Sequence, residues 1–124
     1  DLLAANFIEQ GQKIWLIDWE YAGMGDPYFD LANFAVNQDL STEEIKFFLE
    51  QYNPKFKTKD FSRLMVMRVV SDLREAWWGY LQSRMSRLKF DFYEYGEKHA
   101  ARALSTSITA EYKTWINALN KESK

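Results

Sequence analysis

The stretch WLIDWEYAGMGDPYFD, residues 15–30, ends a short apolar run in an acid and places three more acids and several aromatic rings within the next dozen residues. A strand that needed only burial would end in a turn. Here the strand formers Trp15 to Ile17 lead directly to Asp18. We therefore interpret this run as a strand that delivers Asp18 to a particular position.

The residues around this stretch predict a β-hairpin followed by a helix. Residues 7–17 hold strand formers on both sides of the polar turn EQGQK, where Gly11 can take a positive φ. Asp18 stands at the exit of this hairpin. After the glycines of AGMGDP, Asp26 is placed to cap a helix, with no other role expected, and Pro27 suits the first turn of that helix. The helix should run through YFDLANFAV.

The rest of the chain predicts further helices. The sequence STEE, residues 41–44, is a capping box for a helix that ends before residue 53. A helical pattern from about residue 60 to residue 88 predicts a long helix, and Asp91 with Glu94 predicts the start of a last one reaching about residue 118. The apolar stripe expected to face the core of the long helix consists of Val66, Val69, Val70, Leu73, Trp77, Tyr80, Leu81 and Leu88.

The predicted fold class is mainly α with a small β-hairpin at one end of a helical bundle. Two strands are not stable alone, so the hairpin is expected to pack on the helices. The 124 residues, 47% hydrophobic and 17% aromatic, suffice for one compact core, and we expect residues 1–124 to form a single domain.

Composition and charge exclude several functional classes. The 16 basic and 18 acidic residues are spread along the chain and give a net charge of −2, so neither nucleic acid nor an anionic membrane is an expected partner. Without cysteine and with His99 as the only histidine, disulfides and thiolate or multi-histidine metal sites are excluded. No apolar run approaches the roughly 20 residues of a membrane-spanning helix. We expect a soluble, cytoplasmic protein.

Three polar residues have a spacing with chemical meaning. Asp1 and Asn6 are five residues apart in DLLAAN, and Asp18 follows after one hairpin. In protein kinases, a catalytic-loop Asp accepts the proton of the substrate hydroxyl, and an Asn and a later Asp hold magnesium. An isolated Asp–Asn pair is usually only solvated, and a lone Asp can serve a turn. The joint spacing favours a phosphoryl-transfer site.

Residues 1–34, DLLAANFIEQGQKIWLIDWEYAGMGDPYFDLANF, resemble the choline/ethanolamine kinase family, one of the kinase-like small-molecule phosphotransferases that include the aminoglycoside phosphotransferases. The elements D-x-x-x-x-N, I-D-W-E-Y and D-P-x-x-D-L-A-N occur in this order, and AWWGYLQS and KFDFYEYG look like the family's C-terminal helices. The resemblance implies that the chain is the helical C-terminal lobe of a protein-kinase-like fold. The full-length protein would then be α+β. Because the sequence starts at Asp1 without Met, we expect a fragment that lacks the nucleotide-binding N-terminal lobe.

The resemblance also implies a role for each acid, with ATP as co-substrate and Mg²⁺ as cofactor. Asp1 matches the family's catalytic base, whereas Asn6 and Asp18 match magnesium ligands. Glu20 matches a second metal contact, direct or through water. Asp30 resembles a structural acid that supports the catalytic loop.

Trp78 is expected to face a ligand rather than the core. Its helical neighbours, which include Arg74 and Glu75, are polar, so its ring should project from the polar side of the stripe that buries Trp77. Aromatic faces hold quaternary ammonium groups by about 0.5–2 kcal/mol each. The resemblance places such an amine box at Tyr21, Trp78, Phe90 and Tyr95, with Glu75 to offset the charge of the ligand. Core packing is expected of Phe34, Phe47, Phe48, Trp77 and Trp115.

The resemblance implies that the full-length parent transfers the γ-phosphoryl group of ATP to the hydroxyl of choline. Glu75 stands where animal members tend to have another Trp, and Asn37 where they tend to have an acid, so ethanolamine, thiamine or an aminoglycoside stays open as the acceptor. The alternative that is not an enzyme is a module that only binds an amine. It is considered because the chain holds no G-x-G-x-x-G loop to bind nucleotide phosphates. We expect the chain alone to be inactive, and to self-associate through apolar hairpin surface near Trp15 or Trp19 exposed by truncation.

Overall fold

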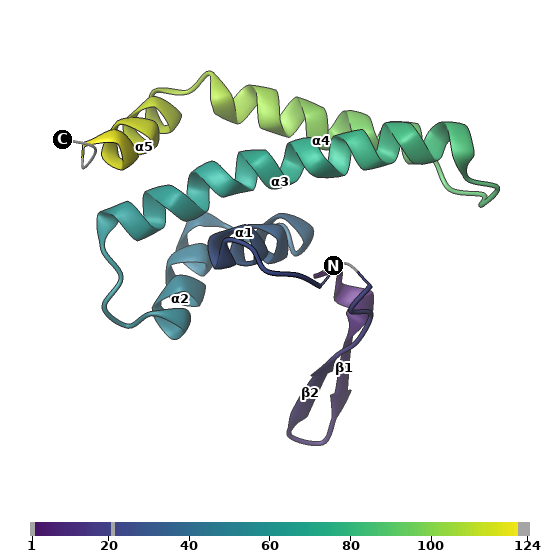
Figure 1. Cartoon of the computed structure of the whole chain (residues 1–124), viewed down its shortest axis with the longest axis horizontal. Coiled ribbons are helices and arrows are strands. Elements are labelled where there is room, and N and C mark those ends of the chain that lie inside the picture. The colour runs from purple at the N-terminus through teal and green to yellow at the C-terminus, as the bar shows by residue number, and fades with distance from the viewer. Residues whose placement is uncertain (1, 21, 122–124) are drawn as a thin grey trace.

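A computed structural model describes residues 2–20 and 22–121 (Figure 1). A 3₁₀ turn, η1 (Ala4–Asn6), leads into an antiparallel hairpin of β1 (Phe7–Gln10) and β2 (Lys13–Leu16). The helices that follow in the described residues are α1 (Pro27–Asn37), α2 (Thr42–Tyr52), α3 (Thr58–Met85), α4 (Phe92–Ser107) and α5 (Ala110–Asn120). The predicted fold class, mainly α with a small hairpin, is confirmed. Within the described part of the chain, none of these helices has the length and apolar character needed to cross a membrane.

The hairpin closes through a two-residue loop. Phe7 pairs with Leu16 at the open end and Gln10 pairs with Lys13 at the other, which leaves a loop that begins at Gly11. Gly11 has a φ of 62°, a backbone conformation that glycine adopts without a steric penalty. The predicted turn is therefore confirmed.

The expectation that the hairpin packs on the helices is wrong for most of its length. Its strands project away from the helices (Figure 1), and Ile14 and Trp15 are 71% and 52% exposed. Contact is made at the base, where the rings of Phe7 and Phe34 lie 5.6 Å apart. The base is also fixed locally, because the Ile17 N–H donates to a carbonyl of η1 at 2.9 Å. The hairpin is thus anchored at its open end rather than covered.

Predicted helix starts are confirmed by side-chain caps. Asp26 accepts a hydrogen bond from the backbone N–H of Tyr28 at 3.0 Å, and Pro follows it in the first turn of α1. Ser41 and Glu44 form both halves of the capping box of α2. Asp91 accepts at 2.8 Å from the backbone N–H three residues later. Each cap satisfies N–H groups that the first turn of a helix leaves free.

The single last helix predicted to reach residue 118 is in fact two helices. α4 ends at Ser107, and Thr109 caps α5 by accepting from the Tyr112 N–H at 3.1 Å. A Thr before an acidic first turn, here with Glu111, is a start signal that the expectation of one helix overlooked. The break allows Trp115 of α5 to pack against the core, as predicted for this ring.

The hydrophobic core lies between α1, α2 and the first half of α3. Phe34 stacks on Phe48 at 4.8 Å, in agreement with the predicted packing of both rings. Phe47 was also expected in the core but is 65% exposed, because Ile45 and Leu49 form the inward face of α2. The buried core cluster consists of Tyr28, Ala35, Ile45, Leu49, Leu64 and Met65.

The buried face of α3 is not the apolar stripe that the sequence predicted. Val69 is buried, but Leu73, Trp77 and Leu81 of the same stripe are 45%, 73% and 56% exposed. The side of α3 that packs against α1 and α4 is polar or small in its second half, where Ser71, Asp72, Glu75, Ala76 and Gly79 are buried. The prediction failed because α1 and α4 supply hydrogen-bond partners to these polar groups.

The second half of α3 approaches α4 so closely that glycine is required on both helices. A Cβ on Gly79 would lie 2.8 Å from the backbone nitrogen of Gly96 and 2.8 Å from the carbonyl oxygen of Phe92. A Cβ on Gly96 would lie 3.0 Å from the carbonyl oxygen of Ala76. The two backbones are therefore in direct contact at this crossing.

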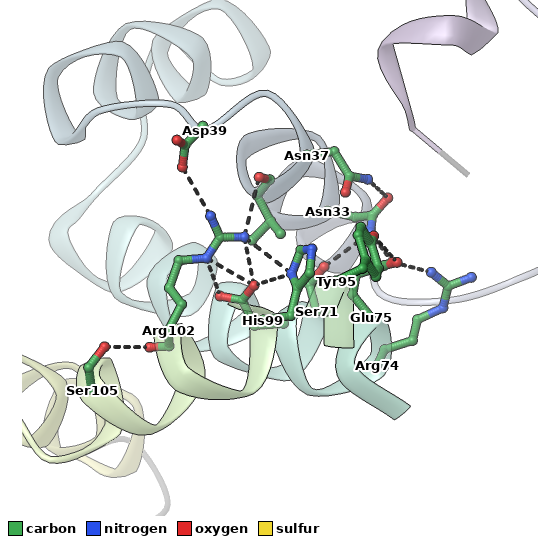
Figure 2. A network of polar contacts seen from close by, with 12 residues as sticks. Asn33, Asn37, Asp39, Ser71, Arg74, Glu75, Tyr95, His99, Arg102 and Ser105 are labelled. Carbon is green, nitrogen blue, oxygen red and sulfur yellow. Dashed lines mark hydrogen bonds and ion pairs between the residues drawn. The ribbon is translucent and has the colours of Figure 1, made fainter. Parts of the chain in front are cut away.

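Arg102 joins α4 to α3 and to the end of α1 (Figure 2). Its guanidinium donates to both carboxylate oxygens of buried Asp72 at 2.7–3.0 Å and to exposed Asp39 at 3.0 Å. His99 Nδ1 lies 2.7 Å from the same Asp72 carboxylate. Burial by itself would raise the pKa of Asp72, but the hydrogen bonds from His99 and Arg102 outweigh it and hold the pKa below its usual range.

Replacing Gly79 with Ala is expected to lower the free energy of unfolding by about 1–3 kcal/mol or more, because the added methyl group would overlap backbone atoms that cannot move independently. Gly25→Ala is the matched control, since a Cβ there meets no atom within 4 Å. Urea unfolding followed by circular dichroism measures both. Equal effects of the two substitutions would contradict the close contact.

Replacing Asp72 with Asn is expected to lower the free energy of unfolding at pH 7 by about 3 kcal/mol or more, because Arg102 loses its buried counter-charge. Folding lowers the pKa of Asp72, so its contribution is fully present above about pH 4 and is lost as the pH falls through the folded-state pKa. Urea unfolding between pH 7 and pH 3 should show the gap between wild type and D72N narrowing below about pH 4.

Asp39→Asn provides the control for this prediction. Asp39 bonds the same guanidinium, but its side chain is 77% exposed, so the loss should stay below about 1 kcal/mol. Asn also tolerates the positive φ of 53° found at this position. If the difference in free energy of unfolding between wild type and D72N stays constant down to pH 3, the carboxylate of Asp72 is not the group that titrates.

Candidate functional site

A cleft of about 650 Å³ lies where the exit of the hairpin meets α1 and α3. The turn after β2 lines it with Asp18 and Trp19, α1 with Asp30 and Asn33, and α3 with Arg74. β2 ends at Leu16, one residue earlier than predicted, and Asp18 follows two residues later on a concave surface, as the opening stretch predicted. A cleft lined by a few convergent polar groups is the usual setting of a binding site.

Asp18 reaches the cleft through an uncommon backbone conformation. Its φ is 62°, in the left-handed region that Asp adopts more readily than most residues but that still carries a steric penalty. The following turn is held by local hydrogen bonds, since the Trp19 indole donates to the Leu16 carbonyl at 2.9 Å and the Ala22 N–H donates to the Trp19 carbonyl at 2.9 Å. Such a conformation is typical of functional sites, where the surroundings fix the residue.

Asn6 lies beside the short segment that joins β2 to Asp18. The carbonyl oxygen of Asn6 accepts the N–H of Ile17 at 2.9 Å, and the residue is 9% exposed. The fold thus brings Asn6 and Asp18, twelve positions apart in the chain, to the same end of the hairpin.

The oxygen groups of Asn6 and Asp18 suit Mg²⁺, which prefers hard oxygen ligands. Within residues 2–20 and 22–121, no three acidic or histidine side chains form a preformed metal site. A magnesium ion that is shared with a nucleotide needs only one or two protein carboxylates, because phosphate oxygens and water complete its shell. The residues therefore fit a shared ion rather than a closed protein cage.

The remaining acids of the predicted site are placed differently. Asp30, in the first turn of α1, lines the same cleft as Asp18. Glu20 is exposed and is not among the residues that line this cleft. Asp1 and Tyr21 lie outside the described residues, so their predicted roles stay predictions.

Both backbone polar groups of Leu2, the residue next to Asp1, form hydrogen bonds, one to α1 and one to the residue that caps the end of α1. The backbone N–H of Leu2 donates to Asn33 Oδ1 at 3.3 Å, and the Leu2 carbonyl accepts from Gln38 Nε2 at 3.2 Å. These bonds fix the start of the described chain relative to the helix that lines the cleft.

The aromatic residues predicted to hold an amine gather at the junction of α3 and α4. Tyr95 lies 5.8 Å from Trp78 and 6.0 Å from Phe90, measured between ring centroids. Phe92, which the sequence analysis did not single out, lies 5.5 Å from Trp78 and 4.8 Å from Phe90. Trp78 and Phe90 are 37% and 56% exposed, so ring surface stays open to a ligand. The closely spaced aromatic residues of FDFYEYG, residues 90–96, could have pointed to Phe92.

Glu75 is buried at the centre of a polar network rather than on an outer face (Figure 2). Its carboxylate accepts from the Tyr95 hydroxyl at 2.8 Å, Asn33 Nδ2 at 3.2 Å and Arg74 Nη1 at 2.5 Å. Burial and the charge of Glu75 raise the pKa of Tyr95, so the hydroxyl stays protonated and remains a donor. Because Arg74 already pairs with Glu75, this carboxylate is not an unpaired counter-charge for a ligand.

Asn33 and Arg74 are the site residues to which sequence reasoning gave no role of their own. Both line the cleft with Asp18, and both bind Glu75. The available signal for Asn33 was an amide among the apolar residues of LANFAV, on a helix whose apolar side must be buried. A polar residue in that position needs a partner inside the protein.

The comparison with protein families supports the motif reading. Residues 1–67 match the model of a family described as the phosphotransferase enzyme family. This region includes Asn6, Asp18 and Asp30 and ends before the aromatic cluster of α3 and α4.

Similar proteins extend this match. Protein LicA homolog of Metamycoplasma hominis is 44% identical over 59 residues, which covers 48% of this chain and 24% of that protein. The probable ethanolamine kinase of Arabidopsis thaliana is 27% identical and covers 90% of this chain and 37% of that protein. The chain therefore spans about a quarter to two fifths of the length of these relatives.

A crystal structure of a choline/ethanolamine kinase family protein from Mesorhizobium loti has a TM-score of 0.87 to this chain at 26% sequence identity. The superposition covers 96% of this chain and 41% of that one. The resemblance of the motifs to the choline/ethanolamine kinase family is thereby confirmed.

Proposed function

The chain belongs to the phosphotransferase enzyme family, and we propose that the whole protein transfers the γ-phosphoryl group of ATP to the hydroxyl of choline. The product would be phosphocholine. The family match and the fold support the reaction type, and the aromatic cluster supports the acceptor.

The observation that carries this proposal is that Glu75 connects the acid-lined cleft to the aromatic cluster. Asn33 and Arg74 line the cleft that holds Asp18, and both bond to Glu75. Glu75 in turn accepts from Tyr95, one of the clustered rings. A hydroxyl attached to a cation held by the rings could therefore reach toward the cleft, as transfer between two bound substrates requires.

In the proposed reaction, the acceptor hydroxyl oxygen bonds to the γ-phosphorus while the bond from that phosphorus to the bridging oxygen breaks and ADP leaves. Asp1 would orient the hydroxyl and take its proton. Asn6 and Asp18 would hold Mg²⁺ against the nucleotide phosphates, where the ion offsets their charge. Glu20 would assist directly or through water, and Asp30 would support the loop from the cleft wall.

The proposed acceptor site relies on aromatic faces rather than on hydrogen bonds. A quaternary ammonium has no N–H to donate, so it is held by the negative faces of rings. Trp78, Phe90 and Tyr95 would supply these faces, with Tyr21 as the further predicted member. Glu75 would contribute by fixing Tyr95, because its carboxylate is already paired.

Ethanolamine is the second candidate acceptor. A relative that matches 90% of this chain is named a probable ethanolamine kinase, which favours a related amino alcohol. Thiamine and aminoglycosides are alternative acceptors of the same phosphoryl transfer. The alternative without phosphoryl transfer is a module that only binds an amine.

The proposed function is tested by measuring ADP release from ATP·Mg²⁺ with a panel of acceptors, using the whole protein. We expect the highest kcat/KM for choline, followed by ethanolamine, because a cation without N–H groups suits a site built from rings. A clear preference for a sugar or an aminoglycoside would refute the choline assignment. Binding of choline without any ADP release would favour the non-catalytic alternative.

Trp78→Ala is expected to raise the KM for choline by about three- to thirtyfold, the equivalent of one cation–π contact, with the KM for ATP unchanged. Trp77→Ala is a matched control, because that neighbouring ring is 73% exposed and belongs to no ring pair identified in the described residues. Steady-state kinetics with each substrate varied in turn gives both constants. A KM for choline that does not change in W78A would remove Trp78 from the acceptor site.

A further inference from the structure

The buried amide of Asn33 connects the two halves of the proposed site. We propose that Asn33 is a positioning residue that fixes the segment next to the proposed base to the acceptor site at Glu75 and Tyr95. This inference rests on the proposed function, since it assigns Asn33 a role in that reaction.

All four hydrogen-bonding positions of the Asn33 side chain are used, and Figure 2 shows its bonds to Asn37, Ser71 and Glu75. Oδ1 accepts from the Leu2 N–H at 3.3 Å and from Asn37 Nδ2 at 3.1 Å. Nδ2 donates to Ser71 Oγ at 3.0 Å and to Glu75 Oε1 at 3.2 Å. The residue is 3% exposed, so water does not compete for these bonds.

These partners require an amide in one orientation. Reversing the amide would turn its NH₂ group toward the N–H groups of Leu2 and Asn37, and its oxygen toward the carboxylate of Glu75. The first contact would set donor against donor, and the second would set acceptor against acceptor. An aspartate at this position could still accept from Leu2, but it would bring a second carboxylate to within bonding distance of Glu75. An aliphatic residue would leave every partner without its bond.

The link continues from Asn33 into the aromatic cluster. Glu75 is 4% exposed and accepts from the Tyr95 hydroxyl at 2.8 Å through its other oxygen. A continuous path therefore runs from the backbone of Leu2, through Asn33 and Glu75, to a ring of the acceptor site. Leaving a buried polar group without its partner costs free energy. A displacement of Leu2 is therefore resisted by the bonds that hold Tyr95, and the reverse also holds.

Gln38 serves as an internal comparison for this path. It binds the carbonyl of the same Leu2 from the C-cap of the same helix, but no bond from its side chain to Glu75 is found in the described residues. Ser71 offers the opposite comparison, because it binds Asn33 Nδ2 but lies off the path from Leu2 to Tyr95.

The test compares N33D, Y95F and S71A in the whole protein by steady-state kinetics. N33D keeps the acceptor atom for Leu2 and opposes Glu75 with a like charge, so it should lower kcat and raise the KM of the acceptor, each by about tenfold, with the KM for ATP within about twofold. Y95F keeps the ring and loses the bond to Glu75, so kcat should fall along with the rise in acceptor KM. S71A should leave both constants within about twofold of wild type.

Hydrogen exchange at the Leu2 amide adds a readout that needs no activity. N33D and Y95F should each speed this exchange by at least about threefold, whereas S71A should not. A merely structural role for Asn33 would lower the melting temperature of N33D and S71A alike, without raising the KM of the acceptor relative to the KM for ATP.

The outcomes separate this inference from the function on which it rests. Normal transfer with an unchanged acceptor KM in N33D, or with unchanged Leu2 exchange in Y95F, would overturn the inference alone. Absence of transfer by the unsubstituted protein to every acceptor would overturn the proposed function, and with it the role of Asn33 in that reaction.

Discussion

The carboxylates of Asp72 and Glu75 lie about one turn apart on the buried face of α3, and their burial constrains how the other helices pack. A buried charge is strongly destabilising unless it is paired and hydrogen-bonded. α4 meets this requirement with Arg102 for Asp72 and with Tyr95 for Glu75, and α1 meets it with Asn33. The crossing of α1 and α4 over α3 is therefore specified by charge as much as by apolar contact.

How far the sequence predicts this structure depends on the range of the interactions involved. The caps at Asp26, Ser41 and Asp91 act over two or three residues, so short motifs were enough to find them. The buried face of α3 was missed because periodicity analysis assumes that buried positions are apolar. The partners that make polar burial possible lie far along the chain, with Asn33 and Glu75 separated by 42 residues.

The same reasoning applies to the candidate site. Asp18 was predictable because a strand, an acid and a family motif coincide there, and the clustering of Trp78 with Tyr95 followed from the resemblance. The network behind them was not predicted, because the position of Asn33 shows that it needs a buried partner but not which one, and Arg74 has no distinguishing local pattern. Asp26 caps α1 as predicted, but the cap is not its only contact, since its second carboxylate oxygen pairs with Arg63 at 2.7 Å and the residue lines the same cleft as Asp18.

The contact between Gly79 and Gly96 has a consequence for ligand selection. Trp78 and Tyr95 each immediately precede one of these glycines, so the separation of their rings follows from a contact between two main chains. Rings held in this way are preorganised, so the acceptor site that we propose there would lose little conformational entropy when a ligand binds. A shorter side chain in place of Trp78 or Tyr95 would remove one ring without changing the distance between α3 and α4. A wider spacing of these rings would therefore require a change at the glycines, in the backbone itself.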